Sequence, residues 1–480
     1  MVRSNVVNPF KERRSVWAQY VTTSLSCLAV LWVVSILLKP SLPRKEMNLR
    51  WSESLPESNK DNVSTDDDEQ VDDNSEEPIF PDVTLDEYPG WLNSFYKGLE
   101  FEIHPDLNTR RLTKDILEKS LEMGCDNMVA NMRPEGNFNY QYNFVEKVLD
   151  DDDMAVRQAG ALWGLSMCWQ YRPDNHMWHV AVDKGIDFYA SHMADGDGFR
   201  YLAYPGETDS ESGGNALLGL ALIEYLRTVK ENNIQVDATR IEKVKGLLKD
   251  IIEFLKFMQL EDQHFSQGYR MDQKRKRNYS SPYFDGETML CFIKAAKYID
   301  GYQDLIPIIE SAAPVMARKY TVSAWREEHD SDETKGFYQW SSMLFTEYYE
   351  ARYKDYELFG DYVIVLGHWI IHTHGILDRL KNTGYAYEGI VSAYTVAKAR
   401  GHKQARDDFA YTIDNGLYKL IQWQVGGPLA HENSFLVENP TEEKIAIGGI
   451  MNGRKDPTIR IDTTQHQLHS LMLASSLVYS

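Results

Sequence analysis

The sequence predicts an all-α domain that follows an N-terminal membrane anchor and an acidic stem, and three observations support this. From Tyr88 onward, apolar residues recur with the helical period and strand-like alternation is scarce. Six segments of this region repeat one layout, and an uncharged run lies near the N-terminus. Because 43% of the 480 residues are hydrophobic, the chain has enough apolar content for a large core.

The predicted membrane anchor covers residues 15–38, which contain no charged side chain and include the run VTTSLSCLAVLWVVSILL. About 20 apolar residues in a helix span the hydrocarbon core of a bilayer. The basic residues that precede this run are Arg3, Lys11, Arg13 and Arg14. They favour a cytosolic tail at 1–14 and a single-pass type II membrane protein of the Golgi, another secretory membrane or the cell surface. The alternative is a cleaved signal peptide.

The predicted stem covers residues 39–87. Its run DDDEQVDDNSEE is acidic and has no aromatic residue, so it cannot bury enough apolar surface to fold, and we expect an extended, disordered tether. Asn-X-Ser sequons begin at Asn62 and Asn278, and both are predicted glycosylation sites of a lumenal protein. The folded domain is expected at 88–480.

Charge and motifs argue against several classes of function. The net charge is -21, which argues against a nucleic-acid partner because phosphate binding needs a basic surface. The sequence contains no nucleotide-binding glycine loop and no HExxH motif, and no cofactor is expected. His368, His372 and His374 lack a carboxylate at ligand spacing, so no metal site is expected either.

Three cysteines lie in the predicted domain, namely Cys125, Cys168 and Cys291, and their spacing matches no zinc motif. Buried free thiols are the favoured interpretation. One disulfide among the three is left open, because the sequence does not select a pair.

The repeated layout is a polar or glycine-rich head followed by a helix rich in small and aliphatic residues. The six segments begin at Val156, Gly213, Phe284, Phe337, Ala386 and Thr463. Longer amphipathic helices lie between them, such as the one from Arg240, whose Ile, Val and Leu side chains form one stripe opposite lysines and acids. The pattern is therefore an outer helix, a polar head and an inner helix, repeated six times.

This layout resembles the (α/α)6 toroid of the six-hairpin glycosidases and the related polysaccharide lyases and epimerases. The resemblance covers about 88–480 and depends on architecture, on heads such as SGGNALLGLALIEYLRT and YFDGETMLCFIKAAKYI. It implies that the inner-helix N-termini converge on one end of the barrel, which holds the cleft, and that the substrate is a carbohydrate. No catalytic motif of these families is matched residue by residue. A terpene-cyclase-like toroid and a helical-repeat scaffold are the rival folds.

The predicted catalytic residues lie at the heads. Asp285 starts the third inner helix, where the helix dipole favours the ionised carboxylate that a base or nucleophile needs. Glu388 stands between aromatic rings, including Tyr387, which would raise its pKa and suit a proton donor. Asp462 and His466 in the last head are expected to assist this pair.

The remaining polar and aromatic residues of the heads are predicted to bind substrate, through stacking on sugar faces or hydrogen bonds to hydroxyl groups. They are Glu135, Tyr140, Tyr142, Arg157, Gln158, Tyr283, Glu287, Gln339, Trp340, Tyr387, Arg460 and Gln465. For each, packing or helix capping is the alternative role.

The sequence therefore predicts an enzyme of the secretory pathway that acts on a glycan or polysaccharide. Hydrolysis of glycosides by paired carboxylates is the first expectation, and lyase or uronate-epimerase chemistry is the second. A non-catalytic helical module that binds a glycan or a protein is the alternative from another class. A cleft lined only by rings and amides would favour that module.

Overall fold

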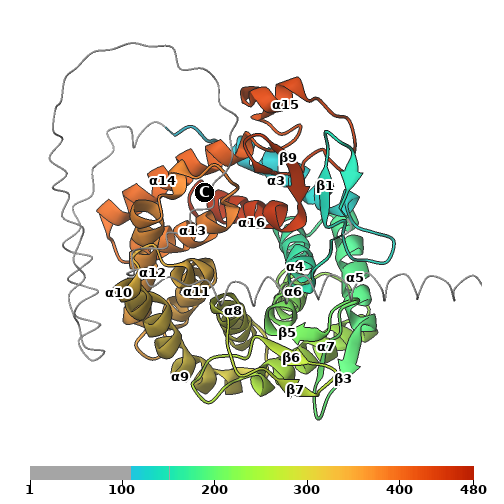
Figure 1. Cartoon of the computed structure of the whole chain (residues 1–480), viewed down its shortest axis with the longest axis vertical. Coiled ribbons are helices and arrows are strands. Elements are labelled where there is room, and N and C mark those ends of the chain that lie inside the picture. Colours follow the sequence, from blue (N-terminus) through green and yellow to red (C-terminus); the bar gives the residue numbers. More distant parts are fainter. Residues whose placement is uncertain (1–109, 151) are drawn as a thin grey trace, which may run out of the picture. The chain divides into compact units, whose positions relative to one another are not determined.

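The computed structural model describes residues 110–150 and 152–480, in which helices form two concentric rings (Figure 1). The predicted signal anchor at 15–38, the stem at 39–87 and the sequon at Asn62 lie outside the described residues. No helix within 110–150 and 152–480 combines the length and apolarity needed to cross a membrane.

The inner ring of the described part consists of six helices. They are α4 (Ala155–Tyr171), α6 (Ser212–Glu231), α8 (Pro282–Tyr298), α11 (Asp332–Ala351), α13 (Gly384–Ala399) and α16 (Ile461–Leu477). Each packs against the next, and α16 closes the ring by contacting both α13 and α4. These helices are buried on nearly every side, which explains why their sequences are rich in small and aliphatic residues.

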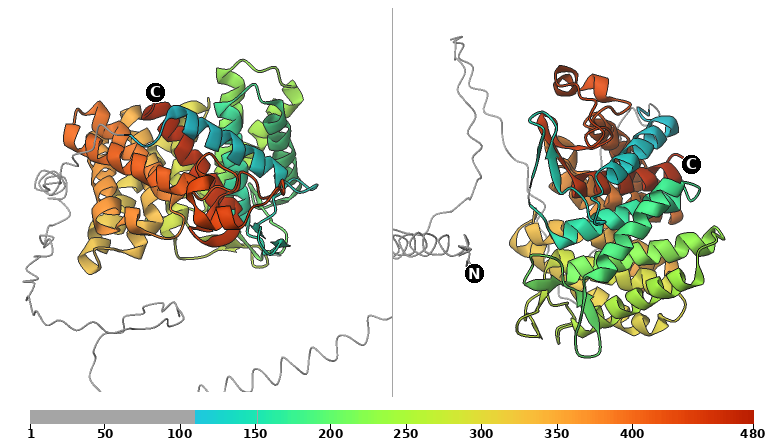
Figure 2. Two further views of the ribbon diagram at one scale, coloured as in Figure 1. Left: turned by 90° about the horizontal axis from the view of Figure 1, so that it is seen from above. Right: turned by 90° about the vertical axis from the view of Figure 1, so that its right-hand side faces the viewer.

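The outer ring of the same region covers the seams of the inner one. Its members are α3 (Lys114–Ala130), α5 (His176–Ser191), α7 (Ala238–Phe257), α9 (Ile306–Ala317), α12 (Tyr356–His368) and α14 (Lys403–Ile421). They are amphipathic, and in α7 Val244, Leu248, Ile251 and Leu255 are buried on one stripe. In Figure 2 the cyan α3 lies alongside the red α16, so the first and last described helices are neighbours.

The inner helices begin close to the predicted heads, with one exception. The helix expected from Phe337 begins instead at Asp332, because the Ser331 hydroxyl accepts a hydrogen bond from the backbone N–H of Glu333 and caps the helix. The first turn of α11 therefore includes Lys335, which precedes the start predicted from the sequence.

Short antiparallel strands correct the purely helical prediction. They are β1 (Gln141–Asn143), β2 (Val148–Leu149), β3 (Met193–Asp195), β4 (Arg200–Leu202), β5 (Asp209–Glu211), β6 (Gly268–Arg270), β7 (Arg275–Lys276), β8 (Met451–Gly453) and β9 (Asp456–Arg460). They pair in the orders β2-β1-β9-β8, β3-β4 and β5-β6-β7. Because β9 leads directly into α16 and β5 into α6, strands lie at the N-terminal end of the inner ring. The strands are too short for alternation to have revealed them.

The connections contain several short helices. They are η1 (Gln303–Leu305), η2 (Arg318–Ser323), α10 (Ala324–Glu327), η3 (Trp369–Thr373), η4 (Ile376–Asp378), η5 (Ala430–Glu432) and α15 (Ser434–Glu438). Both η2 and η3 are π-helical turns that continue an outer helix.

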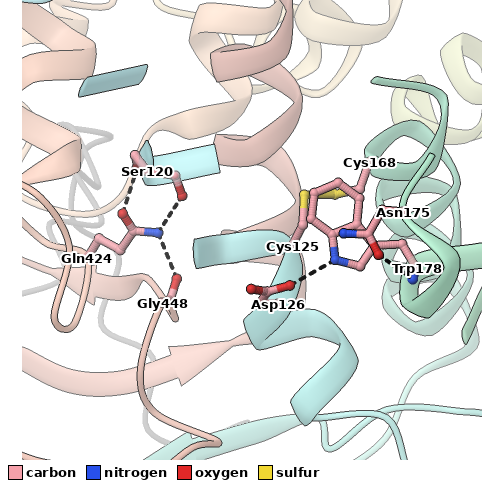
Figure 3. The surroundings of a disulfide bond; sticks show 8 residues. All are labelled: Ser120, Cys125, Asp126, Cys168, Asn175, Trp178, Gln424 and Gly448. Carbon is pink, nitrogen blue, oxygen red and sulfur yellow. Dashed lines mark hydrogen bonds between the residues drawn. A yellow bond between two sulfur atoms is a disulfide. The ribbon is translucent and has the colours of Figure 1, made fainter. Parts of the chain in front are cut away.

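A disulfide joins α3 to α4 between Cys125 and Cys168, with Cα atoms 6.1 Å apart (Figure 3). Beside it, the indole of Trp178 donates to the carboxylate of Asp126 at 2.9 Å. Cys291 is buried and forms no disulfide within the described residues. The expectation of free thiols is therefore wrong for two of these three cysteines, because residues that are 43 apart in sequence meet only when the hairpin folds.

Candidate active site

A pocket of about 280 Å³ opens at the N-terminal end of the inner ring. Its walls come from α8, α11, α13 and α16 and from the segments that lead into them. The lining residues are Tyr283, Lys335, Gln339, Asn382, Gly384, Tyr385, Arg460, Asp462, Thr463 and His466. Four of the six predicted heads therefore meet at one cavity. A larger hollow of about 780 Å³ lies at the other end of these helices, between α6, α7 and α8, and includes Tyr298 and Tyr302.

A buried carboxylate with two histidines lies behind this pocket. The Glu388 side chain is fully buried, and its Oε1 lies 3.0 Å from Nδ1 of His466 and 3.3 Å from Nδ1 of His469. The Gln339 amide donates to Oε2 of Glu388 at 3.3 Å. His466 is 20% exposed and lines the pocket, so its imidazole connects the hidden carboxylate to the cavity.

The electrostatics of this cluster reverse one prediction. Burial alone would raise the pKa of Glu388, but the two histidines lower it below the ordinary value. Burial likewise opposes ionisation of His466, yet Glu388 and Asp462 raise the pKa of His466. The prediction of a protonated Glu388 is therefore wrong in direction. The cluster favours a carboxylate paired with an imidazolium.

A second ion cluster forms one wall of the pocket. The guanidinium of Arg460 contacts the two carboxylate oxygens of Asp462 at 2.5 and 3.0 Å. Nε of Arg157 lies 3.1 Å from the same carboxylate. Arg157 also donates to the hydroxyl of Tyr140. These contacts hold the pKa of Asp462 below its ordinary value against the effect of burial, so Asp462 is a fixed anion between two cations.

Asp285 lies apart from this arrangement. Its carboxylate accepts from the Tyr320 hydroxyl at 2.6 Å and the backbone N–H of Phe265 at 2.7 Å, and it lies 2.6 Å from Nδ1 of His264. Asp285 is completely buried and does not line the pocket. Both carboxylate oxygens hold a loop to the head of α8, which favours a structural role for Asp285 over that of a catalytic base.

Glu287 occupies a different environment two residues later. It is 2% exposed, and within the described residues its Oε2 has no hydrogen-bond partner. Burial first, and Glu211 second, raise the pKa of Glu287 well above its ordinary value. A side chain at Gly213 would clash with that oxygen. Burial and the neighbouring Glu207 and Asp209 also raise the pKa of Glu211, to about 7.

The predicted aromatic platforms divide into two groups. Tyr283 is 45% exposed and lines the pocket, whereas Trp340 is buried and lies edge-on to His466, with ring centroids 6.0 Å apart. Tyr387 points outward onto Gly416 of α14. Tyr140 and Tyr142 are buried behind Arg157 and Glu443.

The remaining predicted binders lie elsewhere. The side-chain amide of Gln158 accepts a hydrogen bond from the backbone N–H of Phe138 at 2.8 Å and donates one to the Phe138 carbonyl at 2.9 Å. Gln465 packs on the glycines of α4. Glu135 is exposed and lines a separate depression of about 450 Å³ with Arg133 and Tyr204. Asn278 is exposed, and its glycosylation stays a prediction.

Sequence reasoning missed several residues of the site. Lys335 and Asn382 line the pocket, and His469 contacts Glu388. For two of them, helical spacing could have predicted a place beside a candidate site residue. Lys335 lies four residues before Gln339, and His469 lies three after His466, so each pair shares a helix face. Asn382 precedes α13 in a segment with no periodic pattern.

Comparisons with known proteins identify the fold. No protein-family model matches the sequence, and no curated protein matches it. A D-mannose isomerase structure is similar with TM-score 0.53 and 10% identity, over 77% of this chain and 99% of that one. The GH76A α-1,6-mannanase from Salegentibacter sp. HEL1_6 gives 0.51 and 9%, over 76% and 99%. Cellobiose 2-epimerase from Bacillus thermoamylovorans gives 0.51 and 10%, over 75% and 98%.

At such low identity the likeness shows the fold alone. The chain has the (α/α)6-toroid fold that these three solved structures share. The resemblance inferred from the repeated heads is confirmed.

Proposed function

We propose that the chain is an enzyme that acts on glycans and that His466 transfers protons at the wall of the pocket. One observation carries this proposal. The partly exposed imidazole of His466 faces the cavity, while its Nδ1 lies 3.0 Å from the fully buried carboxylate of Glu388. A histidine oriented by a buried acid is suited to general acid–base catalysis. Glu388 is then a positioning residue and His466 the catalytic one.

The pocket favours isomerase, epimerase or lyase chemistry over hydrolysis. These reactions remove a proton from a carbon of the sugar. The neutral form of His466 can accept that proton, and the imidazolium form can return a proton to the sugar. Hydrolysis needs two carboxyl groups on either side of the bond that breaks. Among the described residues that line the pocket, Asp462 is the one carboxylate, and Arg157 and Arg460 neutralise it. Both arginines can instead orient substrate hydroxyl or carboxylate groups.

Hydrolysis is the second candidate because of Glu287. Environments that push two carboxyl pKa values apart are typical of an acid and a base. Burial raises the pKa of Glu287, whereas the histidines lower that of Glu388. Glu287 lies one helical turn after Tyr283, a residue of the pocket wall. In this reading Glu287 protonates the leaving group and Glu388 is the anion.

One experiment separates the two reactions. The purified full-length chain is incubated in D2O with a panel of oligosaccharides, including the α-1,6-linked mannotetraose that occupies a GH76 mannanase in a solved complex. Deuterium incorporation at a sugar carbon supports isomerase or epimerase chemistry, and shorter sugars with an unsaturated end support lyase chemistry. Shorter sugars that are all saturated support hydrolysis. His466→Asn should abolish the first two outcomes and Glu287→Gln the third. Glycan binding without any of these outcomes would support the binding module instead.

The location of the enzyme in the secretory pathway is also a proposal. Disulfides persist in oxidising compartments, and the Cys125–Cys168 pair and the exposed sequon at Asn278 support a lumenal domain. The test is protease protection in sealed microsomes. Loss of the C-terminal domain to added protease would overturn the proposed type II topology.

A further inference from the structure

Two histidines and an aspartate converge on the outside of the toroid, where α12 runs into η3. Nε2 of His372 lies 2.9 Å from Oδ2 of Asp408, and Nδ1 of His368 lies 3.4 Å from the same oxygen. One potential ligand atom from each of the three side chains lies within 4.8 Å of the other two. None of these residues lines the pocket described above.

The local structure explains how the three side chains meet. His368 and His372 are four residues apart, so their rings lie on one face of the helix, with centroids 5.8 Å apart and planes 26° from parallel. Here the helix widens into the π-helical turn η3, a feature that is frequent at functional sites. Asp408 comes from α14, which packs against α12. His374, although nearby in sequence, instead contacts Asp330 at 2.5 Å.

The separations of the two imidazole nitrogens from the Asp408 carboxylate suit a tetrahedral metal ion. Zinc binds imidazole nitrogen and carboxylate oxygen at about 2.0–2.2 Å, so neighbouring ligands of a tetrahedral shell lie about 3.3 Å apart. The observed 2.9 and 3.4 Å fall on either side of that value. Two histidines and one carboxylate form a common set of zinc ligands, with a fourth position for water.

Burial and access also fit a metal site. Asp408 is 5% exposed, and within the described residues its Oδ1 has no hydrogen-bond partner. This leaves a buried carboxylate oxygen with unused acceptor capacity, which an ion near Oδ2 would compensate. The side chain of His372 is 41% exposed, which provides a path for the ion and a place for water. The ring of Phe409 covers His368 at 4.7 Å.

We propose that His368, His372 and Asp408 bind a divalent transition-metal ion of the zinc class and that this ion links α12 to α14. Because the ligands come from two outer helices, its role is to hold these helices together. The expectation that the histidines lack a carboxylate considered only nearby positions in sequence. Asp408 lies 36 positions after His372 and approaches only through the fold.

The test uses the purified full-length chain without an affinity tag, stripped with EDTA and titrated with Co²⁺ and Zn²⁺. We expect one equivalent of Co²⁺ to give the visible absorption of a tetrahedral site, displacement by Zn²⁺ and a higher melting temperature. His372→Ala removes an exposed ligand and should weaken binding at least about 100-fold, because loss of even an outer-shell partner costs 10- to 100-fold. Asp408→Asn should remove the absorption as well, with circular dichroism to verify its fold.

Two controls locate the ion. His431 is 73% exposed and remote in sequence from the three ligands, so His431→Ala should bind as the wild type does. Binding that survives in His372→Ala but disappears in His466→Asn would place the ion in the pocket and overturn the proposal. Absence of tetrahedral Co²⁺ absorption in the wild type would overturn it too.

Discussion

At the scale of single residues, the pocket depends on charges that burial would otherwise suppress. Glu388 is fully buried and still has a lowered pKa, because two histidine rings lie within 3.3 Å of it. In return, Glu388 raises the pKa of His466. The two groups therefore form a mutually stabilised ion pair, and each sets the protonation state of the other.

Glu388→Gln tests this coupling through a pH profile. Glu388 raises the pKa of His466, so removing its charge lowers that pKa, and a step that needs the imidazolium should fail at a lower pH. The basic limb of the kcat/KM profile, which reports the free enzyme, is expected to move to lower pH. Glu388→Asp keeps the negative charge, so its basic limb should lie close to that of the wild type. An unchanged basic limb would show that Glu388 does not act through His466.

Glu211→Gln tests the raised pKa in the neighbouring acidic group. The Glu211 pKa is about 7 in the folded protein, against an ordinary value of 4.5. Between these values the folded state holds a proton that the unfolded state has lost, so stability falls as pH rises through this window. The variant is expected to be more stable than the wild type at pH 7.5, by up to about 3 kcal/mol, and equal to it near pH 4.

The measurement for Glu211→Gln is urea unfolding across that range. Glu438 is exposed at the end of α15, and Glu438→Gln serves as the control, with no pH-dependent difference from the wild type. A Glu211 variant that is less stable at both ends of the range would contradict the prediction.

At the scale of the element, helical phase decides which head residues reach the pocket. Tyr283 and Glu287 are four residues apart, as are Lys335 and Gln339, and each pair lies along one face. Asp285 lies two residues from Tyr283, about 200° around the helix, and so points to the opposite side. Tyr387 is separated from Tyr385 in the same way and packs on α14.

Asp285→Asn should therefore act on stability. The carboxylate holds the loop around His264 and Tyr320 to α8, and hydrogen bonds to a buried charge contribute about 1.5–3 kcal/mol each. We expect a loss of about 2–3 kcal/mol in the free energy of unfolding, measured with urea, and an unchanged pH profile of activity. Asp272→Asn, at an exposed turn, should be neutral. Intact stability with lost turnover would restore Asp285 as a catalytic residue.

The directions of the side chains on α8 and α13 also explain which parts of the site the sequence could predict. The heads were visible because inner helices need small and aliphatic residues on all sides, and their starts were placed within a few residues. Position at a helix start did not distinguish Asp285 from Glu388. That distinction depends on the direction of each side chain. His264, which contacts Asp285, comes from a loop, and no local sequence pattern predicts that this loop packs against α8.

At the scale of the whole molecule, the first and last described helices meet where the inner ring closes. α3 packs on α16, and the Cys125–Cys168 disulfide fixes α3 to α4. The Gln424 amide adds a further tie by donating to the carbonyls of Ser120 and Gly448, each at 2.9 Å (Figure 3).

Replacing both cysteines measures one of these ties. A crosslink between residues 43 apart restricts the unfolded chain by about 4 kcal/mol in the chain-entropy description. We expect Cys125→Ser with Cys168→Ser to lower the free energy of unfolding by about that amount. Reduction of the wild type should lower its free energy of unfolding by the same amount. Reducing conditions should not lower the free energy of unfolding of the double variant any further. Equal stability of the oxidised wild type and the double variant would show that the bond does not form.

The closure of the ring between α16 and α4 also has a consequence for synthesis. The ribosome releases the chain in order, so α4 and α13 emerge well before the helix that fills the gap between them. Until α16 is complete, both neighbours present apolar faces to water, and partly folded chains with such faces are prone to aggregate. The inner ring therefore cannot close before α16 has left the ribosome, and until then the open seam between α4 and α13 is the surface through which incomplete chains would associate.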